Sequence, residues 1–291
     1  MQSQTIKSLE GCFIMDGHFE LKKLLGAGAF GTVYLAERVA RGKENDGERF
    51  AVKVLPMPRH ASTQEKQLLV AELLLQMEVS GHKNVVHARE VSHATLKGED
   101  FACIRMDLCE GGDMLDALRE GTLDSQKQAR SAFLQVIDGV MHSHQRGVFH
   151  RDLKYENVLC ACKGNSHHQW TLCRYTALHA SRMYLAPSED LKDTLLHNRT
   201  SGGSGLWLAL LCGDLPWQVA CPASDPNFAA YLQDPSTFSL EHASDELVNF
   251  LQTKIFTVDP SKRASLQEIR DFVKRKPLFG KEGFFSRLFS L

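Results

Sequence analysis

Short apolar runs separated by polar turns make up the first part of the chain. One run begins at Phe19, a second covers Thr32 to Ala36, and a third covers Phe50 to Leu55. Apolar runs of this length, bounded by glycine, proline or polar residues, are typical of β-strands. The polar stretch from Arg41 to Glu48 contains two glycines and predicts a loop between two strands. We therefore expect a small sheet near the start of the chain.

A helical pattern follows these strands. From Thr63 to Val79 the apolar residues recur at helical spacing, with Leu69, Leu73 and Met77 on one side. Two further strands are expected after this helix, at residues 85–91 and 101–108. The remaining part favours helices, which we expect at residues 113–119, 125–146, 204–212, 243–254 and 265–274. Strands first and helices afterwards predict an α+β protein with two segregated lobes.

Composition places the chain among ordinary globular proteins and narrows its partners. It has 291 residues, enough for one two-lobed domain or two small ones, and 43% of them are hydrophobic and 24% charged. A formal net charge of -1 gives no reason to expect a nucleic-acid partner. No apolar run reaches the roughly 18 residues of a membrane span, and the N-terminus lacks a signal-peptide pattern. The eight cysteines therefore indicate reduced thiols, in the cytoplasm or nucleus.

A glycine-rich segment lies between the first two expected strands. Gly26 to Val33 fits the spacing G-x-G-x-x-G-x-V, with glycine at positions 26, 28 and 31. Glycines let backbone amides approach phosphate oxygens closely. Dinucleotide-binding folds use the same glycines to open a helix, whereas strand-like residues follow here. The pattern favours a phosphate-binding turn between two strands, and a tight hairpin without a ligand is the alternative.

Two more motifs follow in order. Lys53 ends an Ala-Val-Lys strand segment that looks like the V-A-I-K strand, whose lysine contacts the α- and β-phosphates. Glu72 lies 19 residues later on the expected helix, where it could pair with Lys53. Residues 150–157 read H-R-D-L-K-Y-E-N and match H-R-D-L-x-x-x-N. In that motif Asp152 would accept the substrate hydroxyl proton, and Asn157 would ligate a magnesium ion.

Together these motifs resemble those of eukaryotic protein kinases of the Ser/Thr type, from about Phe19 to Phe279. Residues 106–109, 147–150 and 229–235 look most similar to fungal kinases of nutrient and cell-cycle signalling. The resemblance implies a two-lobed kinase fold and ATP as the nucleotide, with Lys154 reaching the γ-phosphate. It also implies a protein substrate or partner. The implied segments are an N-terminal extension at 1–18, an N-lobe at 19–108, a C-lobe at 109–279 and a C-terminal tail at 280–291.

The same resemblance implies an adenine site. Met106 would be the gatekeeper residue beside the adenine, and Asp107 to Cys109 the hinge that offers backbone hydrogen bonds to the base. Val33, Ala51 and Leu159 are apolar, as contact with a flat heterocycle requires. The full nucleotide-binding set implied by the resemblance is Leu25, Gly26, Gly28, Gly31, Val33, Ala51, Lys53, Glu72, Met106, Asp107, Cys109 and Leu159.

The chain departs from the family where the chemistry needs a carboxylate. Between Asn157 and Ser188 there is no Asp or Glu, and the best match to the family's Asp-Phe-Gly begins at Arg174. Magnesium binds through one or two carboxylates and the phosphates, so only Asn157 and the phosphates remain as ligands. Arg174 would place a positive charge where the cation should lie. Losing about 4 kcal/mol of metal-based stabilisation would slow transfer roughly a thousandfold.

Three hypotheses remain open at this point. The first is a pseudokinase, a nucleotide-binding or scaffold module with weak or absent phosphotransfer. The second is an active Ser/Thr protein kinase that uses Asp152 as the base, with magnesium held by Asn157 and the phosphates. The third is a damaged or mis-assembled gene product, because the irregularities cluster between residues 158 and 205.

Overall fold

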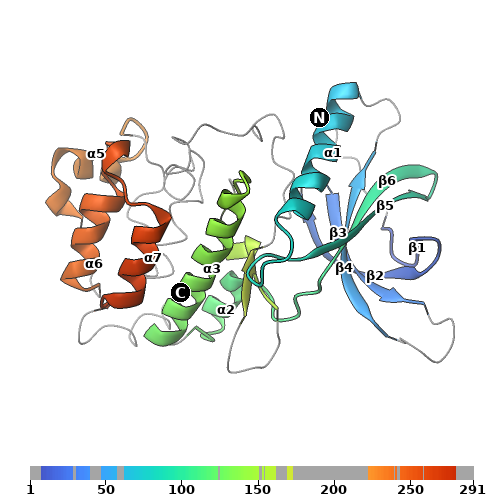
Figure 1. The fold of residues 1–291 in the computed structure, drawn as a ribbon, viewed down its shortest axis with the longest axis horizontal. Coiled ribbons are helices and arrows are strands. Elements are labelled where there is room, and N and C mark those ends of the chain that lie inside the picture. The colour runs from blue at the N-terminus through green and yellow to red at the C-terminus, as the bar shows by residue number, and fades with distance from the viewer. Residues whose placement is uncertain are drawn as a thin grey trace. The chain divides into compact units, whose positions relative to one another are not determined.

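The computed structural model divides into two compact units, the first ending at Cys109 and the second beginning at Glu110. Figure 1 draws both as ribbons, and each unit is described by itself. The described residues are 8–28, 31–39, 47–57, 62–123, 125–150, 153, 155–161, 169–172, 222–238, 240, 243–257 and 259–279.

The first unit holds a six-stranded antiparallel sheet in the order β1-β2-β3-β4-β6-β5. Its strands are β1 (Phe13–Ile14), β2 (Phe19–Gly28), β3 (Gly31–Arg38), β4 (Arg49–Pro56), β5 (Ala88–Leu96) and β6 (Glu99–Met106). The strands expected near residues 19, 32–36, 50–55 and 101–108 are confirmed. The strand expected at 85–91 begins only at Ala88, because Val85 and Val86 are held in a turn against the helix before them.

The register of the sheet separates its side chains into two sets. Val33 lies opposite Lys53, and Ala51 lies opposite Met106. Residues that face each other across an antiparallel pair project from the same side of the sheet, and alternate residues along a strand share that side. These four residues therefore share one side, which we call the inner face. Figure 1 shows helix α1 (Thr63–Glu78) beside the sheet.

The opposite side of the sheet, the outer face, carries the apolar core of this unit. Its cluster includes Tyr34, Val52 and Cys103, and segment 8–15 adds Leu9 and Ile14 to it. The phenol oxygen of Tyr34 accepts a hydrogen bond from the backbone N–H of Leu9 at 3.2 Å. Residues that the sequence assigned to an N-terminal extension therefore belong in part to the sheet and its core.

Helix α1 confirms the helix expected from Thr63, and its buried residues are not all apolar. Leu73 is buried, whereas Met77 is 38% exposed and Gln76 is buried. The Gln76 side-chain amide donates to the backbone oxygen of Val86 at 3.2 Å. This bond satisfies a buried polar group and explains why glutamine faces inward.

The second unit is mostly helical among the described residues. Its helices are α2 (Met114–Arg119), α3 (Gln126–Gln145), α5 (Pro226–Gln233), α6 (Asp245–Phe250) and α7 (Leu266–Arg275). A π-helical turn, Leu251–Ile255, continues α6, and short 3-10 turns lie at Tyr155–Asn157, Pro235–Thr237 and Pro260–Lys262. Strands β7 (Val158–Cys160) and β8 (Trp170–Leu172) form a separate antiparallel pair.

Side-chain caps explain where the two best-defined helices of this unit begin. Ser125 precedes α3 and Ser265 precedes α7, and each forms a capping box with the residue three positions on. The helices expected at 113–119, 125–146 and 265–274 are confirmed, and that expected at 243–254 begins at Asp245. The helix expected at 204–212 lies outside the described residues. One cluster of buried side chains joins α3, α6, α7 and β8, including Phe133, Ile137, Leu247, Ile269 and Trp170.

Candidate functional site

The glycine-rich turn connects β2 to β3, and its glycines meet different surroundings. A Cβ atom on Gly31 would lie 2.5 Å from the backbone oxygen of Val54, closer than real Cβ contacts. A Cβ atom on Gly26 would meet nothing within 4 Å, and one on Gly28 would meet only the Gly31 oxygen at 3.9 Å. Packing of the sheet therefore requires Gly31, while Gly26 and Gly28 leave open space beside the backbone. Glycines without side chains leave the backbone accessible, which is what the predicted approach of a phosphate group would require.

Lys53 lies near the middle of β4 and is 2% exposed. Its cross-strand neighbours are Val33 on β3 and Ile104 on β6, both buried apolar residues. Burying an ammonium group is costly unless it is paired, and Lys53 is not without a partner. The side chain of its predicted partner, Glu72, lies outside the described residues, so that pairing stays a prediction.

The residues predicted to contact adenine fall into two groups. Val33, Ala51 and Met106 are buried on the inner face together with Lys53. Leu159 is buried in the second unit, on β7, so its approach to the other three stays a prediction. Leu25 is 45% exposed on β2.

The predicted hinge begins directly after β6. The backbone N–H of Asp107 donates to the oxygen of His87 at 3.0 Å, which ties the connection to the segment before β5. Cys109 is half-buried, and its sulfur is not part of a disulfide. The first unit therefore contains the apolar inner face, the buried Lys53, and strand β6 with the start of the predicted hinge.

The predicted catalytic segment is described only in part. Asp152, Lys154 and Arg174 lie outside the described residues, so their roles stay predictions. Asn157 is 3% exposed at the end of a 3-10 turn that leads into β7, and it is not without a partner. Within the described ranges, no group of three or more His, Cys, Asp or Glu side chains could hold a metal ion.

His144 is a buried residue that the sequence did not single out. It lies near the end of α3, and its ring centroid is 4.6 Å from that of Phe149. Neither ring nitrogen has a hydrogen-bond partner among the described residues, and burial lowers the pKa of the imidazole to about 4. The ring is therefore neutral at pH 7. The helical spacing of Phe133, Ile137 and Val140 continues to position 144 and could have predicted its burial.

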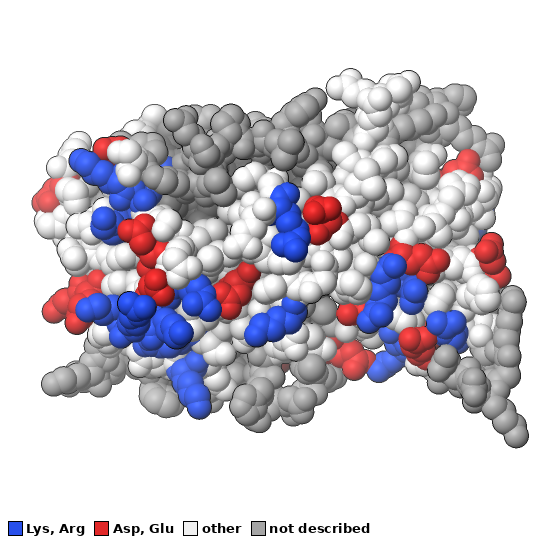
Figure 2. All heavy atoms as spheres, viewed as in Figure 1, with Lys and Arg blue, Asp and Glu red and all other residues white. Residues whose placement is uncertain are grey.

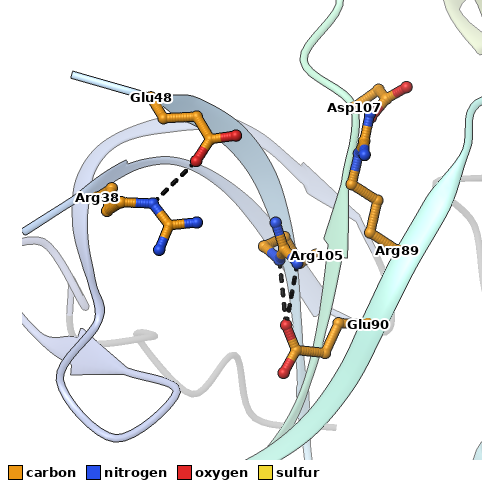
Figure 3. A network of polar contacts seen from close by, with 6 residues as sticks. All are labelled: Arg38, Glu48, Arg89, Glu90, Arg105 and Asp107. Atoms are coloured by element: carbon orange, nitrogen blue, oxygen red, sulfur yellow. Dashed lines mark hydrogen bonds and ion pairs between the residues drawn. The ribbon is translucent and has the colours of Figure 1, made fainter. Parts of the chain in front are cut away.

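A layer of arginines on the outer face was also missed. Arg38 and Arg105 lie over the ring of Phe19, and Arg89 and Arg105 over that of Phe50, at 4.5 to 5.9 Å. We call Arg38, Arg89 and Arg105 the arginine layer. Each of them pairs with a carboxylate, Glu48, Asp107 and Glu90 respectively (Figure 3). Figure 2 likewise shows basic and acidic side chains interspersed over the described residues of one face.

Comparison with known proteins decides the family. Residues 19–273 match the family described as "Protein kinase domain". The chain belongs to the protein kinase family. Such a domain is two-lobed with a β-sheet in its N-terminal lobe, and the first unit of this chain contains a six-stranded sheet. Members transfer a phosphoryl group from ATP with the help of magnesium.

Several curated kinases resemble the chain over most of its length. It is 28% identical over 297 residues to "Negative regulator of sexual conjugation and meiosis" of Schizosaccharomyces pombe, covering 89% of the chain and 60% of that protein. It is 30% identical over 297 residues to "CBL-interacting protein kinase 16" of Oryza sativa subsp. japonica, covering 92% and 58%. A shorter match, 30% over 145 residues, is to "Serine/threonine-protein kinase ksp1" of S. pombe, covering 48% of the chain and 29% of that kinase. The chain thus spans at most about three fifths of these kinases.

The relatives support the resemblance to Ser/Thr kinases, including fungal ones. Among the helices that the structure describes, none is both long and apolar enough to cross a bilayer.

Proposed function

We propose that the protein binds ATP through its first unit and transfers phosphate weakly or not at all. The observation that carries the proposal is the burial of Lys53 on the inner face, beside Val33, Ala51 and Met106. The ammonium group of Lys53 is not without a partner, and the strands hold it among apolar side chains. Its position next to an apolar surface and an open glycine turn suits a ligand with a flat base and phosphates.

Different residues of the chain would contact the base and the phosphates of the nucleotide. The inner face would cover one side of the adenine ring, and the backbone of Asp107 and Cys109 would offer hydrogen bonds to its edge. Open space beside Gly26 and Gly28 would let backbone N–H groups approach the phosphates. Lys53 would contact the α- and β-phosphates. A bound magnesium ion would neutralise part of the phosphate charge, and Asn157 is the residue predicted to hold it.

Weak transfer is proposed from the residues after Asn157. No carboxylate occurs from there to Ser188, and Arg174 stands where the family has the aspartate that holds magnesium. Phosphoryl transfer depends mostly on positioning and electrostatic stabilisation, so Asp152 cannot compensate for a poorly held metal. A deficit of about 4 kcal/mol corresponds to a rate roughly a thousandfold lower.

A second candidate function is an active Ser/Thr protein kinase. The observation that favours it is the complete H-R-D-L-x-x-x-N match at 150–157, with lysine at 154 as in Ser/Thr kinases. Asp152 would then orient and deprotonate a protein substrate's hydroxyl group, and the phosphates with Asn157 would hold magnesium. On either function we propose that the kinase domain covers 19–279 and that a protein is its substrate or partner.

A thermal unfolding experiment separates these functions. Purified protein is melted with and without ATP, in each case with and without magnesium. ATP should raise the melting temperature without magnesium, and no rise in either condition would reject nucleotide binding. Phosphorylation of a generic protein substrate is then measured with magnesium, for the wild type and for Asp152→Asn. Robust transfer that this substitution abolishes would reject weak transfer and leave the active kinase.

A further inference from the structure

Asp107, the first residue after β6, is anchored twice by one neighbouring segment. Its backbone N–H donates to the oxygen of His87 at 3.0 Å. Its carboxylate accepts a hydrogen bond from Nε of Arg89, two residues further along that segment. The backbone oxygen of Asp107 accepts no hydrogen bond from any residue that the structure describes. Two hydrogen bonds therefore hold the residue Asp107, one at its backbone N–H and one at its carboxylate, while its carbonyl stays available to a ligand.

The side chain of Arg89 is itself held in place. Its guanidinium carbon lies 5.9 Å from the ring centroid of Phe50, which is only 5% exposed. Arg105 covers the same ring at 4.5 Å and pairs with Glu90 at 3.1 Å. Figure 3 shows the Arg89 side chain running to Asp107 and the Arg105–Glu90 pair nearby. An arginine that stacks on a fixed ring loses less freedom when it forms a hydrogen bond.

The Arg89–Asp107 pair contributes little to stability in itself. The two side chains are 46% and 42% exposed, and half-exposed ion pairs are weak contributors to folding. Asp107, however, follows directly after a residue of the inner face. Met106, the residue immediately before Asp107, is 1% exposed and lies opposite Ala51. A contact that matters little to the fold can therefore still place a backbone group beside a bound base.

We propose that Arg89 is a positioning residue that sets the preference of the nucleotide site for a 6-aminopurine over a 6-oxopurine. Through the carboxylate of Asp107 it holds the carbonyl oxygen that receives the exocyclic amine of adenine. A 6-oxopurine carries an oxygen at that position and cannot donate to the carbonyl. The inference rests on the proposed nucleotide site and adds to it the residue that fixes its base preference.

The test compares two triphosphates that differ at this position. Dissociation constants for ATP and for inosine triphosphate are measured without magnesium, for the wild type, Arg89→Ala and Arg89→Lys. Loss of one well-placed hydrogen bond should weaken ATP binding by about threefold to tenfold in Arg89→Ala. Binding of inosine triphosphate should change by less than about twofold, and lysine should restore part of the preference for ATP.

Arg38→Ala is the matched control. Arg38 belongs to the arginine layer, stacks on Phe19 and pairs with Glu48 at 2.8 Å, but its ion pair does not involve Asp107. This variant should keep the wild-type ratio of the two constants. Thermal unfolding of each variant checks folding, and Asp107→Asn, expected to reduce the preference partly, replaces any Arg89 variant that does not fold.

Two results would overturn the inference in distinguishable ways. An unchanged ratio in a folded Arg89→Ala variant, or equal weakening of both triphosphates, would reject the role of Arg89 alone. Failure of the wild type to bind either triphosphate would reject the nucleotide site and the inference with it.

Discussion

The two faces of the first unit's sheet are built in opposite ways from the same strands. On the outer face, charged groups stay near the surface, where the arginine layer covers Phe19 and Phe50 and each guanidinium has a carboxylate partner. On the inner face, apolar side chains surround one buried ammonium group, that of Lys53. Because alternate residues of β4 project to opposite sides, this one strand contributes side chains to both faces. We therefore expect substitutions on the outer face to change stability, and those on the inner face to change binding.

The largest expected effect is on the outer face. Phe50→Ala removes a ring that is 5% exposed and packs edge-on against Phe19 at 5.6 Å, with Arg105 above it. The free energy of unfolding, measured by chemical denaturation, should fall by about 3–5 kcal/mol. Phe13, which is 54% exposed on β1, offers a matched control, and Phe13→Ala should change it by less than about 0.5 kcal/mol. Similar losses in both variants would contradict the assignment of stability to the covered ring.

The second unit also contains a buried ionisable group, His144, which can be compared with Lys53 of the first unit. Its pKa is about 4 in the fold, against an ordinary value of 6.5, because burial disfavours the charged ring. As the pH falls from 6.5 to 4, His144 therefore binds a proton in the unfolded chain but stays neutral in the folded chain. Stability that is complete above pH 6.5 should decline over this range by up to about 3 kcal/mol.

The measurement is the free energy of unfolding as a function of pH for the wild type and for His144→Leu. The variant should lack this part of the acid-induced decline, although other groups also titrate. Parallel curves for the two proteins would show that His144 is not the group responsible.

On the inner face, Lys53→Met should act on the ligand. Replacing the ammonium group by a thioether removes the charge that is predicted to meet the phosphates, so ATP should bind at least about tenfold more weakly. Lys23→Met is the control, since Lys23 is an exposed lysine on β2. Calorimetric titration of both folded variants measures the effect. Equal ATP affinity in the two would remove the proposed role of Lys53.

The smallest expected effect is a difference in alkylation rate between Cys103 on the outer face and Cys109 in the predicted hinge. Burial on the outer face raises the pKa of Cys103 to about 12, so its thiol should resist alkylation at pH 8. Cys109 is half-buried in the predicted hinge, and its alkylation should slow severalfold when ATP is present. Peptide mapping by mass spectrometry follows each cysteine separately. Rapid labelling of Cys103 in the folded protein, or no protection of Cys109 by ATP, would contradict the comparison.

Local sequence signals located most elements because those signals are short-range. The apolar run at 50–55 and the serine caps before α3 and α7 need only neighbouring residues to be recognised. Helix α5 was missed, although Asp225 caps it and Pro226 occupies its first turn, which is a readable start signal. The burial of Gln76 could not be predicted from local signals. Which side of α1 is buried depends on a hydrogen bond to Val86, a residue outside the helix.

The same distinction between local signals and tertiary packing applies to the candidate site. By itself, the sequence determined the family and the order of its motifs, because spacing along the chain carries them. It also placed Val33, Ala51 and Lys53 on neighbouring strands. Only the tertiary structure decided that Lys53 is buried and that Arg89 meets Asp107 beside the ring of Phe50. Those contacts depend on how β4, β5 and β6 are paired, and the register of that pairing depends on packing of the whole sheet, which no local pattern specifies.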